Sequence, residues 1–205
     1  AVFECARGGI LRDGLGFDRG QVAVVTEGGA GDHPGMNYLE TVEDIARLKA
    51  VIPHNVAPSG YAVLNAADPL VAAMAQDCPG QIIYFCADRH LPLMATHRAQ
   101  GKRCVFVDEG AIVASDGAWR ESIPLRDIPI TRGGLLGFPV ENGMAAVAAA
   151  WGAGLAWDAI RRGLASFNGD GDNAPGRFNV MEFRSATVIA DYGHNPDAIA
   201  ALAAA

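Results

Sequence analysis

The sequence lacks the features that would place the chain in a membrane. It contains no run of about 18 consecutive apolar residues, the minimum for a membrane-spanning helix, and its Ala-rich stretch MAAVAAAWGAG is shorter than that. The opening residues AVFECARGG show no basic lead followed by an apolar run, so they do not predict a signal peptide. We therefore expect a cytoplasmic protein without a membrane partner.

Cysteine is scarce, and its spacing indicates no special site. The cysteines form no C-x-x-C pair, and their spacing suits neither a zinc site nor a disulfide framework. We expect reduced thiols with a structural role, as is usual in the cytosol. The four are Cys5, Cys78, Cys86 and Cys104.

Positive charge and phosphate-binding motifs are also lacking. The chain has 16 Lys and Arg against 23 Asp and Glu, a net charge of -7, so we expect no nucleic-acid partner. Neither G-x-x-x-x-G-K-[ST] nor G-x-G-x-x-G after a strand occurs. The chain therefore carries no phosphate cradle of its own, although it can contain half of such a site.

What is present is a regular alternation of apolar runs and helical patterns. Half of the 205 residues are hydrophobic, enough for the core of one domain or slightly more. Continuously apolar strands predict a sheet covered on both faces, and their alternation with helices predicts an α/β domain with a mostly parallel sheet. Strands are expected at 22–26, 60–66 and 81–87, a hairpin at 103–115, and helices at 38–52, 68–78, 93–101, 140–154 and 156–167.

A linker divides the chain unequally. Residues 168–177, NGDGDNAPGR, are rich in Gly, Asn and Asp, and two further strands are expected in 178–193. We place a domain boundary near Ala174, with one domain over 1–174 and the start of another over 175–205. AVF begins within a strand pattern and AIAALAAA stops within a helix pattern, so we expect a segment of a longer chain.

The loops that follow the first two apolar runs hold candidate metal ligands. Ligands of open α/β sheets bind beyond the carboxyl ends of the strands. The loop EGGAGDHPG holds four glycines with Asp32 and His33, which suits a divalent metal or an ordinary surface loop. Glu4 lies among apolar residues and either needs a partner or metal or is a strand-edge carboxylate. Arg7 is expected in a glycine-rich turn.

Three further polar residues have two interpretations each. Lys49 shares a helix face with Ile45 and Ile52, so it is either partly covered or extends along the apolar surface to water. Asn65 ends a strand just before Asp68-Pro69, and Asn142 is expected at the start of a helix. Each asparagine can cap a helix or contact a ligand.

The C-terminal part contributes three more candidates. Arg177 is the last residue of the linker and would ordinarily be solvated. Asp191 and His194 stand between the last strand and a helix that begins with Pro196 and Asp197. They can face a nucleotide at a helix N-terminus, or form an Asx-type turn with a capping His.

Several of these blocks together resemble the Mur ligase-like part of the cyanophycin synthetase family. The blocks are ECARGGILRDGLGF, VAVVT…GDHPG…YLETVEDIARLK, GYAVLNAADPLVAAMA, PGRFNV and ATVIADYGHNPDAI; ARGGILR and DYGHNPDA are the most specific. The implied fold is α/β: a Mur ligase-like central P-loop ATPase domain without its N-terminal P-loop part, followed by the start of a Rossmann-like C-terminal domain.

The resemblance also implies an ATP-dependent ligase reaction. In the family ATP phosphorylates a carboxylate, an amine attacks the acyl phosphate, and an amide forms. The implied cofactors are ATP and Mg²⁺, the substrates arginine and an aspartate polymer, and the full-length protein a homo-oligomer. The alternatives are another Mur-type amino-acid ligase and a catalytically degenerate Mur-like binding or structural module.

The family's functional positions transfer onto eight residues. Glu4 and His33 match metal-binding positions for Mg²⁺. Lys49, a catalytic position, falls roughly where Mur ligases carry a lysine that is often carbamylated. The nucleotide-contacting positions are Asn65, Asn142, Arg177, Asp191 and His194, and His194 is also counted as catalytic.

Three residues depart from the family pattern. Glu27 stands in place of an Asn, Pro34 in place of a Leu, and Ala67 in place of an acid. The Walker A loop that the family requires lies outside these 205 residues. We therefore expect the isolated chain to release no phosphate from ATP.

Overall fold

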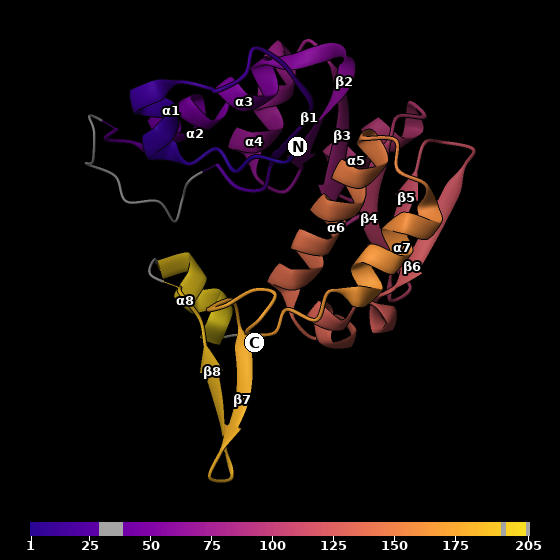
Figure 1. Cartoon of the computed structure of the whole chain (residues 1–205). Helices are drawn as coiled ribbons and strands as arrows, with labels where there is room; N and C mark the ends of the chain where they lie inside the picture. Colours follow the sequence, from indigo (N-terminus) through magenta and orange to yellow (C-terminus); the bar gives the residue numbers. More distant parts are fainter. Residues whose placement is uncertain (29–38, 194–195, 204–205) are drawn as a thin grey trace.

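The computed structural model describes residues 1–28, 39–193 and 196–203 and contains two sheets (Figure 1). The larger sheet has six strands in the order β1-β2-β3-β4-β5-β6, and the smaller pairs β7 with β8. The strands are β1 Gly20–Val25, β2 Val56–Asn65, β3 Gln81–Cys86, β4 Cys104–Asp108, β5 Ala111–Ser115, β6 Arg120–Pro124, β7 Asn179–Phe183 and β8 Ala186–Ala190. The α-helices are α1 Arg7–Asp13, α2 Val42–Lys49, α3 Val51–His54, α4 Pro69–Ala73, α5 Pro92–Ala99, α6 Gly137–Gly152, α7 Trp157–Ser166 and α8 Pro196–Ala203, and the short 3-10 helices are η1 Met74–Asp77, η2 Leu125–Asp127 and η3 Pro129–Gly134.

Both faces of the larger sheet are buried, as the continuous apolar runs predict. Neighbouring residues of a strand point to opposite faces. In β3, Ile83 and Phe85 pack with Met144 of α6, whereas Tyr84 packs with Met94 of α5 in a separate core. Strands β1 to β4 are parallel, and β5 and β6 are antiparallel. The prediction of an α/β fold with a mostly parallel sheet is confirmed.

The hairpin expected at 103–115 is formed by β4 and β5. Its two turn residues, Glu109 and Gly110, have φ values of 47° and 72°. Positive φ at both positions is the geometry that matches the twist of a two-residue hairpin. The edge strand β6, which the apolar pattern does not indicate, pairs with β5 beyond this hairpin.

The N-terminal residues correct one expectation. Residues 1–6 form no strand, and Arg7 begins helix α1 instead of lying in a glycine-rich turn. Val2 is fully exposed, and the amides of Gly9 and Ile10 bond to the carbonyl of Ala6. A strand needs a neighbour to take its backbone hydrogen bonds, and β1 pairs only with β2 among the described residues.

Two helices begin at different places from those expected. Thr41 caps α2: its hydroxyl accepts from the Asp44 amide at 3.1 Å, and the Asp44 carboxylate accepts from the Thr41 amide at 3.2 Å. This capping box starts the helix at Val42, within the range expected. Helix α6 begins at Gly137, so Asn142 lies in its second turn and does not cap it.

The smaller sheet follows the linker. β7 and β8 pair antiparallel from Asn179 opposite Ala190 to Phe183 opposite Ala186, as the two expected strands predict. Phe183 and Met181 remain about half exposed or more, at 62% and 49%. We propose that a second domain starts here, near Ala174.

No helix within the described ranges is long and apolar enough to cross a membrane. All four cysteines are free thiols. Burial raises the pKa of Cys104 to about 11, which keeps this thiol protonated and unreactive at neutral pH.

Candidate functional site

The carboxyl ends of β1 and β2 and the first turn of α6 lie at the same edge of the larger sheet. A side chain on Gly152, the last residue of α6, would come within 3.3 Å of Tyr61 and 3.4 Å of Ile83. Ile83 lies near the amino end of β3, so α6 runs back against the strands. Its N-terminal turn therefore points toward the carboxyl edge, where ligands of open α/β sheets bind.

Asn65 joins the ends of β1 and β2. Its side-chain amide donates to the carbonyl of Thr26 at 3.0 Å, and its side-chain oxygen accepts from the amide of Ala67 at 2.9 Å. The residue is only 8% exposed, so both groups need the partners they have. The structure therefore gives Asn65 a backbone-holding role at the strand ends.

Asp68 holds the next part of the same turn. One carboxylate oxygen accepts from the amide of Gly28 at 2.6 Å, and the other caps α4 by accepting from the amides of Leu70 and Val71. A side chain on Gly28 would come within 3.0 Å of the Leu70 Cβ and 3.1 Å of the Asp68 carboxylate. Sequence reasoning identified the cap but missed the contact with Gly28, because the two residues are 40 positions apart and no local pattern signals it.

Lys49 holds the residue between Thr26 and Gly28. Its ammonium group lies 3.3 Å from the carbonyl oxygen of Glu27 and 3.8 Å from its carboxylate. The Lys49 side chain is 20% exposed, whereas that of Glu27 is 62% exposed. The ammonium group also lies at the C-terminal end of α2, where a positive charge is favourable. One departure from the family pattern, Glu27, thus contacts the proposed catalytic lysine.

Glu4 lies apart from this network, in a shallow pocket. The pocket has a volume of about 180 Å³ and is lined by Phe3, Gly9 and Phe17 among others. Glu4 is exposed, so its carboxylate has no need of a buried partner, contrary to one interpretation of the sequence. The described residues contain no cluster of three metal-ligating side chains, and His33 lies outside them.

Strand β8 ends at Ala190, and the carboxylate of the next residue, Asp191, accepts hydrogen bonds from two backbone amides. One oxygen accepts from the amide of Phe178 at 2.8 Å and the other from the amide of Gly193 at 2.6 Å. The second bond closes an Asx-type turn. The first ties the end of β8 to the residue that follows Arg177, where Phe178 has a φ of 52°. His194, the partner expected beside Asp191, lies outside the described residues.

Arg177 and Asn142 are both exposed. Two phenylalanine rings close to them in sequence are in contact. The rings of Phe138 and Phe178 meet edge to face with their centroids 5.6 Å apart. Phe138 lies one helical turn before Asn142, so the two share a face of α6. The structure therefore brings the linker beside the first turns of α6. Desolvation raises the pKa of the neighbouring Glu141.

The site residues thus form two described groups. Lys49 and Asn65 contact adjacent residues at the exit of β1, Glu27 and Thr26. Arg177, Asp191 and Asn142 lie around the linker and the start of α6. His33 and His194 lie outside the described ranges.

No family model matches the chain. Its sequence is 40% identical over 197 residues to a cyanophycin synthetase from Geminocystis herdmanii (strain PCC 6308), an alignment that covers 96% of this chain and 22% of that protein. The chain is a homologue of one segment of cyanophycin synthetase. It therefore spans about a fifth of the length of this relative.

Solved structures agree on the fold. MurF from Acinetobacter baumannii superposes with a TM-score of 0.61 at 23% identity, covering 89% of this chain and 36% of that one. FolC from E. coli, in a complex with DHPP and ADP, superposes with a TM-score of 0.55 at 26% identity, covering 87% and 36%. The chain has the Mur ligase-like α/β fold, and the resemblance inferred from its sequence blocks is confirmed.

Proposed function

We propose that the protein containing this segment is an ATP-dependent, amide-forming ligase of the cyanophycin synthetase type. It activates a carboxylate as an acyl phosphate and joins it to the amine of arginine on a poly-aspartate backbone. The identity of 40% to a cyanophycin synthetase over 96% of the chain supports this assignment. The ADP complex of FolC, on the same fold, supports the use of ATP.

The observation that carries the proposal is the set of side-chain contacts that hold the residues directly after β1. Three consecutive residues after this strand are each held by a side chain from another element. The pairs are Thr26 with Asn65, Glu27 with Lys49, and Gly28 with Asp68. A loop fixed in this way at the carboxyl edge of a parallel sheet is where a nucleotide ligand is expected.

Within this site we assign Lys49 as the charged group nearest the reaction. An ammonium group can stabilise negative charge that develops on a transferring phosphoryl group or an acyl phosphate. Its neighbour Glu27 keeps it oriented toward the exit of β1. Asn65 acts as a positioning residue, because its amide already bonds to the backbone on both sides.

Mg²⁺ fits the carboxylate of Glu4 and, by resemblance, His33. Proteins hold this ion through one or two carboxylates together with substrate phosphates, so an exposed acid such as Glu4 suits it without a complete protein cage. When bound, the ion would offset charge on the phosphates of ATP.

The group of residues around the linker and the start of α6 would complete this site, together with the domain that follows the linker. Arg177 and Asn142 would contact the nucleotide, with His194 beside it. Asp191 would place Arg177 and His194, since its two oxygens hold their neighbours Phe178 and Gly193. A site completed by a second domain protects a hydrolysable acyl phosphate from water.

The test is nucleotide turnover by the full-length protein. With Mg²⁺, ATP and an aspartate polymer primer, we expect ADP release that depends on arginine and not on the other amino acids. Turnover with a different amino acid would favour another Mur-type ligase. No turnover with any amino acid, and no effect of His33→Ala on nucleotide binding, would favour a degenerate module.

A further inference from the structure

The linker leads from α7 to β7 past the start of α6 (Figure 1), and it closes around the side chain of Asn179, the first residue of β7. The side-chain amide of Asn179 donates to the carbonyl oxygens of Gly169 at 2.9 Å and Ala174 at 3.0 Å. Its side-chain oxygen accepts from the amide of Gly176 at 2.6 Å. Asn179 is only 8% exposed, so its polar groups depend on these partners. One side chain thus joins three parts of the linker.

The linker is also braced from within by Asp170. The carboxylate of Asp170 accepts from the backbone amides of Asp172 at 3.2 Å and Asn173 at 2.9 Å, and from the side-chain amide of Asn173 at 2.8 Å. The Asn173 amide, above all, lowers the pKa of Asp170, so this carboxylate is charged at neutral pH and keeps its hydrogen bonds. The linker is therefore a compact loop whose shape is set by its own side chains and by Asn179.

The backbone on both sides of Arg177 is held by this arrangement. Before Arg177, the amide of Gly176 donates to Asn179, and after it, the amide of Phe178 donates to the carboxylate of Asp191 at 2.8 Å. Phe178 has a φ of 52°, which a bulky residue rarely adopts and which persists only where its surroundings enforce it. Asn179 and Asp191 together set the direction in which the chain presents Arg177.

Both ends of the linker pack against η3 and α6. Near the start of the linker, a side chain on Gly169 would come within 3.3 Å of Ile130 in η3. At its end, the ring of Phe178 meets that of Phe138 in α6, with 5.6 Å between the centroids. The guanidinium carbon of Arg132 lies 5.7 Å from the centroid of the same Phe178 ring. The shape of the loop therefore also determines where its last residues lie against α6.

We propose that Asn179 is a positioning residue of the ligase site, which holds Arg177 in the place where it meets the nucleotide. It acts through the linker backbone. An arginine that pairs with phosphate needs a defined direction of approach, and a backbone that is already ordered lowers the entropic cost of that contact. This inference rests on the proposed function, because the nucleotide contact of Arg177 is part of that proposal.

Steady-state kinetics of the full-length protein test whether Asn179 acts through Arg177. We expect Asn179→Ala and Arg177→Ala each to raise the KM for ATP at least about tenfold and to leave the KM for arginine unchanged, since only the nucleotide contact is lost. The double variant should be no worse than Arg177→Ala alone, because effects that pass through one contact do not add. Losses that add in the double variant would overturn the proposal.

Hydrogen–deuterium exchange of the full-length protein without nucleotide gives a measurement that does not depend on activity. Asn179→Ala should speed exchange in peptides that cover 168–178 and leave peptides from β2 at the parent rate. Unchanged exchange would show that Asn179 does not hold the linker, and faster exchange with an unchanged KM for ATP would show that Arg177 does not need it. A parent protein that releases no ADP, with faster exchange in the variant, would instead overturn the proposed function and the positioning role with it.

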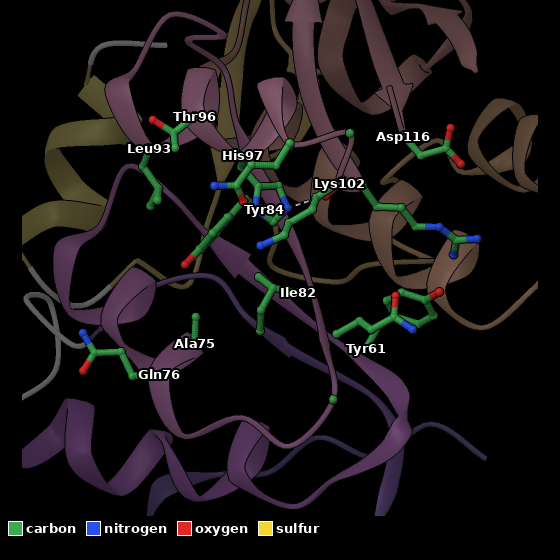
Figure 2. A pocket seen from close by; sticks show the side chains of 15 residues that line it. Tyr61, Ala75, Gln76, Ile82, Tyr84, Leu93, Thr96, His97, Lys102 and Asp116 are labelled. Carbon is green, nitrogen blue, oxygen red and sulfur yellow. Dashed lines mark hydrogen bonds between the residues drawn. The ribbon is translucent and has the colours of Figure 1, made fainter. Parts of the chain in front are cut away.

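Two control variants and one conservative variant complete the test. Asn168→Ala removes an exposed asparagine at the start of the same linker. Gln76→Ala removes an exposed amide that lines a hollow of about 790 Å³ at the amino edge of the larger sheet (Figure 2). Both should keep the parent KM for ATP, and an equal rise in the Asn168 variant would contradict the specific role of Asn179. Asn179→Asp keeps the size and the acceptor oxygen but loses both N–H donors, so it should also raise the KM for ATP and keeps the test decisive if Asn179→Ala unfolds.

Discussion

Three residues that follow β1 are individually fixed, and the middle one bears the only charge among them. Glu27 contacts Lys49 through its carbonyl oxygen and its carboxylate, while its neighbours are held through backbone atoms. The backbone contacts would survive a change of side chain at residue 27. The ion pair would not, which makes Glu27 the residue through which this chain can differ in chemistry from proteins with Asn at the same place.

Gly28 is the position at which the fixed turn is most sensitive to added volume. In Gly28→Ala the new methyl group would lie 3.0 Å from the Leu70 Cβ and 3.1 Å from the Asp68 carboxylate. We expect a loss of about 1–3 kcal/mol in the free energy of unfolding, as is typical of overpacking. Urea denaturation measures it. The control is Gly9→Ala, whose methyl group would meet nothing within 4 Å and should leave the free energy of unfolding unchanged or about 0.5–1 kcal/mol higher. Equal midpoints for the two variants would contradict the close approach.

At the scale of elements, the buried strands were predictable and the polar or irregular elements were not. Most of β3 and the second half of β2, residues 61–64, are continuous apolar runs, as burial on both faces of the sheet requires. β6 reads RESIP, a polar edge strand that ends in proline, so no apolar pattern indicates it. Helix α1 contains Gly8 and Gly9, which favour a turn locally. Helix α6 begins with Gly137 and carries Pro139 in its first turn, so its helical pattern becomes visible only later.

The connection between α5 and β4 should make stability depend on pH. His97 of α5 is 5% exposed and bonds to the carbonyl of Arg103 just before β4. Burial lowers the pKa of this imidazole in the folded state, so the unfolded chain binds its proton at a higher pH than the folded chain does. The stability that the neutral His97 contributes is fully present above the ordinary histidine pKa of about 6.5. It is lost as the pH falls from there toward the lowered pKa of the folded state.

Thermal unfolding of the parent and of His97→Gln between about pH 5 and 7.5 isolates this effect. We expect the melting temperature of the parent to fall more on acidification than that of the variant. The matched control is His90→Gln. His90 is exposed, and its backbone amide donates to the Asp88 carboxylate in the same turn. The melting temperature of this variant should depend on pH as that of the parent does. If the His97 variant loses as much stability on acidification as the parent does, the buried neutral imidazole is not the cause.

At the scale of the whole molecule, the proposed site draws on parts of the chain that are distant in sequence. The contacts at the exit of β1 join residues 22 to 40 positions apart, and Phe138 of α6 meets Phe178 beyond the linker. Motifs identified Lys49, Asn65 and Asp191 as candidates from the sequence. They could not show that the side chains of Asn65 and Asp191 bond to backbone, because that depends on which loops the fold brings together.

The most direct test of the central claim, that the exit of β1 belongs to a ligase site, is arginine-dependent ADP release by the full-length protein carrying Lys49→Gln. The control is Arg47→Gln on the same helix, whose side chain is 78% exposed and, among the residues that the structure describes, pairs with Asp44 one turn earlier. We expect Lys49→Gln to lower kcat by about 10²-fold or more, the scale of losing a charge-stabilising group, while Arg47→Gln keeps the parent rate and both melt like the parent. A Lys49 variant that turns over at the parent rate would contradict the account.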